Sequence, residues 1–145
     1  MSHLERAIAI AVEAHKGQVD KSGAPYVLHP LRMMLSLSAE NERIVAVLHD
    51  VCEDCEGWTF ERLADEGFST EIIEALRSVT KMPDGEEDYF SFVRRAKTNA
   101  IGARVKRADL VDNLDLKRIA DPKSKDFERL KRYRAALKIL DGDER

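Results

Sequence analysis

Hydrophobic residues recur at helical spacing along most of the chain. In the first segment, an i, i+3, i+4 stripe runs from Leu4 through Ile8 to Val12. Similar stripes, bounded by Gly, Pro and capping residues, predict helices at about 4–16, 31–38, 42–55, 59–65, 69–80, 87–97, 100–119 and 123–140. Thr59 and Ser69 are expected to cap two of these helices. The pattern therefore predicts an all-α fold, a single bundle of about eight helices.

Strand signals are scarce. The segment "PYVLHP" is the one candidate, and it is too short to found a sheet. The segment "KMPDGEED" is expected to be a loop, with turn chemistry at Pro83, Asp84 and Gly85.

Composition and charge restrict the class of protein. The chain has 145 residues, 35% of them charged and 43% hydrophobic, which fits one globular domain over residues 1–145. No apolar run approaches the ~20 residues of a membrane-spanning helix, and the N-terminus lacks a signal-peptide cleavage site. We therefore expect a cytoplasmic protein with no membrane partner. A net charge of −3 also disfavours nucleic acid as a partner.

A basic stretch lies in the second half of the chain. It is either a solvated helix face or a phosphate-facing surface, and both interpretations stay open. Its residues are Arg94, Arg95, Lys97, Arg104, Lys106 and Arg107. Nearby, Tyr89 and Phe92 are three residues apart on a predicted helix, so core packing is favoured over a role in a pocket.

The segment "AVLHDVCEDC" combines two cysteines with four other polar residues. On a continuous helix at about 100° per residue, the cysteines fall in the apolar stripe of Leu48 and Val51. Free cysteine behaves in a core as a small hydrophobic residue, and the chain has no second cysteine pair for a zinc ribbon. The cysteines are therefore interpreted as core residues.

The opposite face of this helix carries His49, Asp50, Glu53 and Asp54. Three carboxylates side by side repel one another unless a cation lies between them. Imidazole and carboxylate together suit Mn²⁺, Fe²⁺ or Zn²⁺. His29, before Pro30 at a helix entrance, and Asp109, on a half-buried helix, are the candidates for completing a four-ligand site.

These residues resemble the H…HD…D pattern of the HD-domain metal-dependent phosphohydrolases. Three blocks, "AHKGQVDKSGAPYVLHP", "LHDVCED" and "VKRADLVDNL", are similar in order and spacing to the hydrolase domain of RelA/SpoT proteins and to stand-alone small alarmone hydrolases. The similarity covers about residues 15–113, and it implies a stand-alone hydrolase without a synthetase domain.

The resemblance implies roles for nine residues. His29, His49, Asp50 and Asp109 would bind one Mn²⁺, although another divalent transition metal is also compatible. Glu53 and Asp54 match the pair that assists the attacking water and proton transfer. Lys21 and Ser22 match a nucleotide-contacting loop, and Asn113 matches a substrate-binding asparagine. Apart from the resemblance, charge makes Lys21 and one or more of Lys97, Arg104, Lys106 and Arg107 candidates for balancing the substrate's phosphates.

The chain departs from the family at Asp20, where the alarmone hydrolases typically have an Arg that packs on the guanine base. An Asp offers neither a planar guanidinium nor positive charge. Arg107 and Asp112 also differ from common family residues.

The leading hypothesis is an Mn²⁺-dependent enzyme that releases pyrophosphate from a guanosine 3′-diphosphate such as (p)ppGpp, a small-molecule substrate. A phosphatase for another nucleotide, either a nucleoside monophosphate or the 2′-phosphate of NADPH, is the alternative that Asp20 motivates. A non-catalytic nucleotide-sensing domain is the third hypothesis, and homo-oligomerisation stays open.

Overall fold

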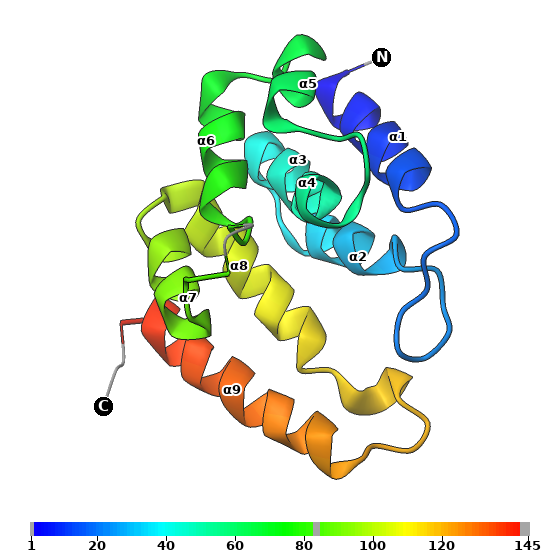
Figure 1. The fold of residues 1–145 in the computed structure, drawn as a ribbon, viewed down its shortest axis with the longest axis vertical. Coiled ribbons are helices and arrows are strands. Elements are labelled where there is room, and N and C mark those ends of the chain that lie inside the picture. Colours follow the sequence, from blue (N-terminus) through cyan, green and yellow to red (C-terminus); the bar gives the residue numbers. More distant parts are fainter. Residues whose placement is uncertain (1, 83–84, 143–145) are drawn as a thin grey trace.

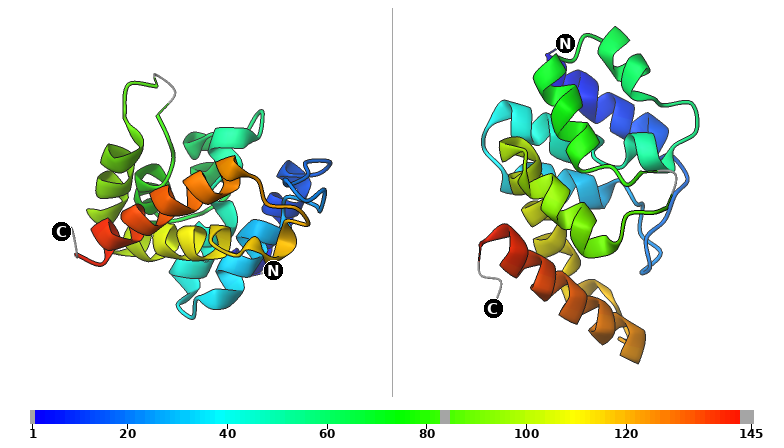
Figure 2. Two further views of the ribbon diagram at one scale, coloured as in Figure 1. Left: turned by 90° about the horizontal axis from the view of Figure 1, so that it is seen from below. Right: turned by 60° about the vertical axis from the view of Figure 1, so that its left-hand side comes forward.

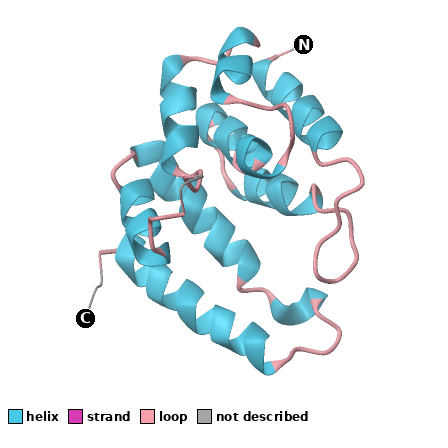
Figure 3. Ribbon diagram, viewed as in Figure 1, coloured by secondary structure: helices cyan, strands magenta, loops and turns pink. Residues whose placement is uncertain are grey.

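The computed structural model describes residues 2–82 and 85–142, and every regular element in this part of the chain is helical (Figure 3). The elements are α1 (His3–Ala14), α2 (Leu28–Ser36), α3 (Glu40–Leu48), α4 (Val51–Asp54), α5 (Phe60–Asp65), α6 (Thr70–Ser78), α7 (Tyr89–Lys97), α8 (Ala100–Asn113), the 3-10 turn η1 (Leu116–Arg118) and α9 (Ser124–Leu140). The predicted all-α fold is confirmed. Residues 83 and 84 of the predicted turn lie outside the described residues.

Side-chain caps fix where several helices begin. The hydroxyls of Thr59 and Ser69 accept hydrogen bonds from the backbone N–H groups of Arg62 and Ile72, as predicted. Asn99 caps α8 in the same way. Each cap satisfies a backbone N–H that has no partner within its helix.

Helix α3 is the centre of the fold and packs against α1, α2 and α8 (Figure 1). Its residues Ile44, Val45, Val47 and Leu48 are at most 1% exposed. A second, smaller core joins α9 to α7 and α8 (Figure 2). It consists of Val93, Leu110, Ala136 and Ile139.

The continuous helix expected over residues 42–55 is wrong. Helix α3 ends at Leu48, Asp50 has a ψ of 1°, and α4 restarts at Val51. At the break, His49 is buried and only 4% exposed, whereas Glu53 and Asp54 are exposed. The apolar side behaves as predicted: Cys55 is buried and Cys52 is half-buried against the main core.

The expected helix over 100–119 is likewise shorter, because α8 ends at Asn113 and η1 follows. Helix α2, in contrast, begins three residues earlier than expected, at Leu28. Pro30 therefore lies in the first turn, where its missing N–H breaks no hydrogen bond within the helix.

The loop between α1 and α2 holds one isolated antiparallel bridge, from Val19 to Pro25. None of the helices in the described ranges is long and apolar enough to cross a membrane.

Close packing at Gly102 positions α8, which carries Lys106, Asp109 and Asn113. A Cβ at residue 102 would clash with the buried Ser78 hydroxyl and lie 3.2 Å from the Ala96 carbonyl oxygen. We expect Gly102→Ala to destabilise the protein by about 1–3 kcal/mol in urea denaturation, although alanine favours a helix by about 1 kcal/mol.

The control is Ser78→Ala, which removes the clashing oxygen. The double variant S78A/G102A should be destabilised by less than the sum of the two single changes. A G102A protein as stable as the wild type would show that α6 and α8 do not approach this closely.

Candidate metal centre and its cavity

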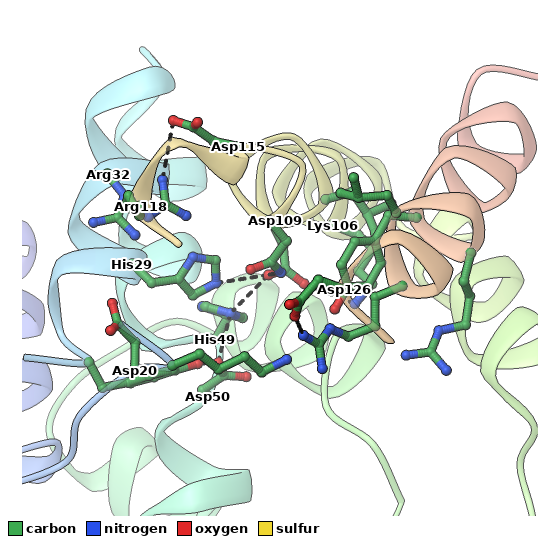
Figure 4. Close-up of a pocket in the computed structure, with 18 of the residues that line it drawn as sticks. Asp20, His29, Arg32, His49, Asp50, Lys106, Asp109, Asp115, Arg118 and Asp126 are labelled. Atoms are coloured by element: carbon green, nitrogen blue, oxygen red, sulfur yellow. Dashed lines mark hydrogen bonds and ion pairs between the residues drawn. The ribbon is translucent and has the colours of Figure 1, made fainter. Parts of the chain in front are cut away.

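His29 and His49 face each other in the interior, with ring centroids 5.4 Å apart. His29 lies in the first turn of α2, and His49 directly follows α3. Both Nε2 atoms point toward one carboxylate on α8. The Asp109 Oδ1 atom is 2.9 Å from His29 Nε2 and 3.8 Å from His49 Nε2 (Figure 4). Three helices thus bring two imidazoles and a carboxylate together.

The second ring nitrogen of each histidine is also engaged. His29 Nδ1 lies 2.6 Å from Asp112 Oδ2, and His49 Nδ1 lies 2.8 Å from the carbonyl oxygen of Ala46. An imidazole that donates from Nδ1 presents the Nε2 lone pair, which is how metal-binding histidines are usually held. The two rings are therefore oriented as metal ligands.

Asp50 completes the set of donor atoms. Its Oδ2 atom lies 3.0 Å from His49 Nε2 and accepts a hydrogen bond from the Tyr26 hydroxyl. One donor atom each from His29, His49 and Asp50 lie within 4.8 Å of one another. With Asp109 beside both histidines, this mixture of nitrogen and oxygen donors fits a divalent transition metal.

The charges in this cluster are strongly coupled. Burial alone would lower the pKa of His29, but hydrogen bonds with Asp109 and Asp112 outweigh burial and raise it to about 9. Burial opposes the charge of Asp109 too, yet Lys106 and His29 hold the pKa of that carboxyl well below its usual range. A metal ion bound there would take the place of the proton that His29 and Asp109 share.

Glu53 and Asp54 lie on α4, beside Asp50. One carboxylate oxygen from each of the three residues lies within 4.8 Å of the others. Both side chains are accessible to solvent, but the walls around them remove part of their hydration. This burial, together with the negative charge of Asp50, raises the pKa values of Glu53 and Asp54. The Glu53 carboxylate is also fixed by the backbone N–H of Lys81, at 2.7 Å.

A cavity of about 600 Å³ opens over the cluster. All ten residues predicted for the site line it: Lys21, Ser22, His29, His49, Asp50, Glu53, Asp54, Lys106, Asp109 and Asn113. Tyr89 and Phe92 line it as well. Phe92 is also a buried core residue and Tyr89 packs against the second core, so the favoured interpretation, core packing, is confirmed.

Two of the predicted substrate contacts already have partners. The Lys106 ammonium is buried and lies 2.9 Å from Asp109 Oδ2. Asn113 Nδ2 donates to Asp109 Oδ1 at 3.0 Å. Both side chains therefore support the carboxylate of a candidate metal ligand.

Most of the basic stretch does not line this cavity. Of its six residues, Lys106 alone lines the cavity. Arg95 instead pairs with Glu87, Arg104 with Glu42 and Arg107 with Asp141.

Comparison with known proteins gives sequence relatives and a structural neighbour. The guanosine-3′,5′-bis(diphosphate) 3′-pyrophosphohydrolase of Spiroplasma citri is 36% identical over 104 residues, which is 69% of this chain and 13% of that protein. The protein of the same name from Aquifex aeolicus is 30% identical over 121 residues, 77% of this chain and 17% of its own length. Further relatives carry GTP diphosphokinase or pyrophosphokinase names. No protein-family model matches the chain.

The solved structure of a metazoan SpoT orthologue that hydrolyses ppGpp superimposes with a TM-score of 0.77. The match covers 100% of this chain and 86% of that one at 22% identity, so it shows the shared fold. The chain is a homologue of the SpoT/RelA proteins. It spans only 10 to 17% of the lengths of the curated relatives that it matches.

In this SpoT/RelA homologue, Asp20 shapes its own loop. Its Oδ1 atom accepts hydrogen bonds from the backbone N–H groups of Ser22 and Ala24 and from the Ser22 hydroxyl. Burial alone would raise the pKa of Asp20, but these hydrogen bonds lower it. A charged carboxylate therefore lies at the cavity edge where the resemblance predicts an Arg.

Several residues of the cavity were not predicted. Tyr26 binds Asp50, and Arg32 holds Asp112 through two hydrogen bonds of 2.8 and 3.0 Å. Helix α9 adds a group that lines the far wall: Asp126, Arg129, Leu130, Arg132 and Tyr133. Nothing in the local sequence separates these α9 residues from a solvated helix face, because their position depends on tertiary packing.

Asp112 should tune metal affinity through His29. We expect Asp112→Asn to weaken binding of Mn²⁺ or Zn²⁺ by about 10–100-fold, because it removes the negative charge behind the imidazole. Calorimetric titration of the protein with each metal measures this change directly. Asp115→Asn is the control, since Asp115 pairs with Arg118 and contacts neither histidine. Equal metal affinity in both variants would exclude a role for Asp112 in holding His29.

Proposed function

We propose that the chain is a metal-dependent phosphohydrolase that removes pyrophosphate from the 3′ position of a guanosine 3′-diphosphate such as (p)ppGpp. The names of its sequence relatives support the reaction. The observation that carries the proposal is the convergence of His29, His49, Asp50 and Asp109 beneath a cavity large enough for a nucleotide.

The four residues would hold the metal, for which we propose Mn²⁺. A divalent metal bound there polarises a phosphoryl oxygen and lowers the pKa of a bound water. Lys106 and Asn113 keep the Asp109 carboxylate charged and oriented. Tyr26 does the same for Asp50.

Glu53 and Asp54 supply the acid–base chemistry in this proposal. They line the cavity next to Asp50. Burial and the charge of Asp50 raise their pKa values, which makes each carboxylate a stronger base. Attack of water on the phosphorus bonded to the 3′ oxygen breaks the bond between these two atoms and releases pyrophosphate. One of the two carboxylates would accept the proton of that water, and the 3′ oxygen takes up a proton and leaves as the 3′-hydroxyl. Lys21 and Ser22, on the loop across the cavity, would contact the nucleotide.

Asp20 favours one alternative substrate class. A carboxylate at the cavity edge does not stack on a base, so the same metal centre could serve a nucleoside monophosphate or the 2′-phosphate of NADPH. Such a reaction releases orthophosphate instead of pyrophosphate.

Product identity tests the proposal. Protein supplemented with Mn²⁺ should release pyrophosphate from ppGpp, and His49→Ala or Asp109→Ala should reduce kcat at least 1000-fold, since each removes a ligand of the metal. Pyrophosphate and orthophosphate are assayed separately, with ppGpp, GMP and NADPH as substrates. Release of orthophosphate from GMP or NADPH by a protein inert toward ppGpp would establish the alternative.

The two acid–base candidates can be separated by isosteric substitution. We expect Glu53→Gln and Asp54→Asn each to lower kcat by about 10²–10⁴-fold while metal affinity stays within a few-fold of the wild type. Stopped assays measure kcat and calorimetry measures metal binding. Glu56→Gln, at an exposed residue in the turn that follows α4, is the control. If one substitution instead weakens metal binding, the replaced residue is a metal ligand.

A further inference from the structure

The wall of the cavity formed by α9 carries a group of cations that the metal centre does not use. Arg129 and Arg132 are on α9, and Lys21 is on the loop between α1 and α2. All three line the cavity, and we call them the basic wall. The predicted metal ligands lie on other elements, at α2, at α8 and around the junction of α3 and α4.

Positive charge in the basic wall exceeds the negative charge available to it. Asp126 is its nearby carboxylate; it pairs with Arg129, and its Oδ2 atom accepts from the Lys123 backbone N–H at 2.7 Å. Within the described part of the chain, Arg132 has no carboxylate partner. Burial lowers the pKa of Lys21, and the charges of Arg129 and Arg132 lower it further, so these cations lie near enough to repel.

Two tyrosine rings hold Arg132. Its guanidinium carbon lies 4.9 Å from the ring centroid of Tyr89 and 5.9 Å from that of Tyr133. A guanidinium that packs on aromatic rings keeps its N–H groups available at the edges, where they can bind phosphate in pairs. The buried Tyr89 hydroxyl lacks a hydrogen-bond partner among the described residues.

The cations of the basic wall come from α9 and from the loop between α1 and α2, whereas the predicted metal ligands lie on other elements. In Figure 4, Asp126, the ion-pair partner of Arg129, lies on the opposite side of His49 from Asp20. Lys106, the cation closest to the cluster, is already paired with Asp109. A phosphate group at the metal therefore leaves the charge of the basic wall uncompensated.

We propose that Lys21, Arg129 and Arg132 form a second anion subsite, which takes the 5′-phosphates of a nucleotide. The 3′-phosphates of the same nucleotide would occupy the metal centre, and this part of the inference rests on the proposed function. Arg132 provides paired N–H donors to the phosphate oxygens, and Lys21 and Arg129 provide charge from the other sides. The subsite selects nucleotides that carry phosphate at both ends of the ribose.

Binding without turnover tests the subsite directly. In EDTA, wild-type protein should bind GDP at least about tenfold more tightly than guanosine, as measured by calorimetry, since a charge-assisted bidentate contact contributes about that much. Arg132→Gln should remove most of this difference, and Arg132→Lys should retain part of it. Lys131→Gln is the matched control, because Lys131 is exposed on the same helix and pairs with Glu128.

GDP binding no tighter than guanosine binding, or an R132Q protein that distinguishes them as the wild type does, would overturn the proposal. These outcomes do not depend on hydrolysis, so they are distinct from a failure of the proposed reaction. Arg132 is exposed, and R132Q is therefore expected to fold normally, which circular dichroism verifies.

Kinetics give the second readout. With ppGpp, R132Q should raise KM about tenfold with little change in kcat. With guanosine 3′-diphosphate, which has a free 5′-hydroxyl, the same substitution should leave KM unchanged. An equal rise in KM for both substrates would place Arg132 at a part of the nucleotide other than the 5′-phosphates.

Discussion

Burial of the Asp109 carboxylate is the constraint on which the arrangement of the centre depends. A carboxylate that is 8% exposed is costly unless hydrogen bonds and opposite charges compensate it. Here His29 comes from α2 and Lys106 and Asn113 from α8, and His49 lies beyond them at the end of α3. Lys106 and Asn113 bind Asp109 from within α8, but the contacts with His29 and His49 require α2 and the end of α3 to approach α8 in one register.

Much of this structure is encoded in short-range sequence patterns. Helical periodicity and capping residues predicted the all-α fold, because a buried stripe and a capped N-terminus depend on neighbours within one or two turns. Six of the ten site residues could be named because imidazoles and carboxylates at these spacings suit metal and acid–base chemistry. Lys21, Ser22 and Asn113 were named from the resemblance to the alarmone hydrolases, and Lys106 from its charge. The cavity that they line together is consistent with that reasoning. Their individual roles are still predictions.

Other features depend on tertiary contacts that no local pattern records. The apolar stripe continues through Leu48 and Val51, and no Gly or Pro marks the break at Asp50, so periodicity predicts a continuous helix. The charges of α9 resemble a solvated face until packing on α7 and α8 brings Arg132 to the cavity. The contact between Asp112 and His29 likewise joins residues that are 83 positions apart in the sequence.

The loop of Asp20 has a consequence for how this binding site could change over time. One carboxylate oxygen organises the backbone from Ser22 to Ala24, so residue 20 determines both loop shape and the chemistry facing the ligand. Replacing Asp20 by Arg, with no other change, would add a guanidinium. It would also remove the hydrogen bonds that hold the loop in its present shape. Substitutions at positions 20 and 22 are therefore expected to be coupled, and a change of residue 20 alone would alter the shape of the loop as well as its charge.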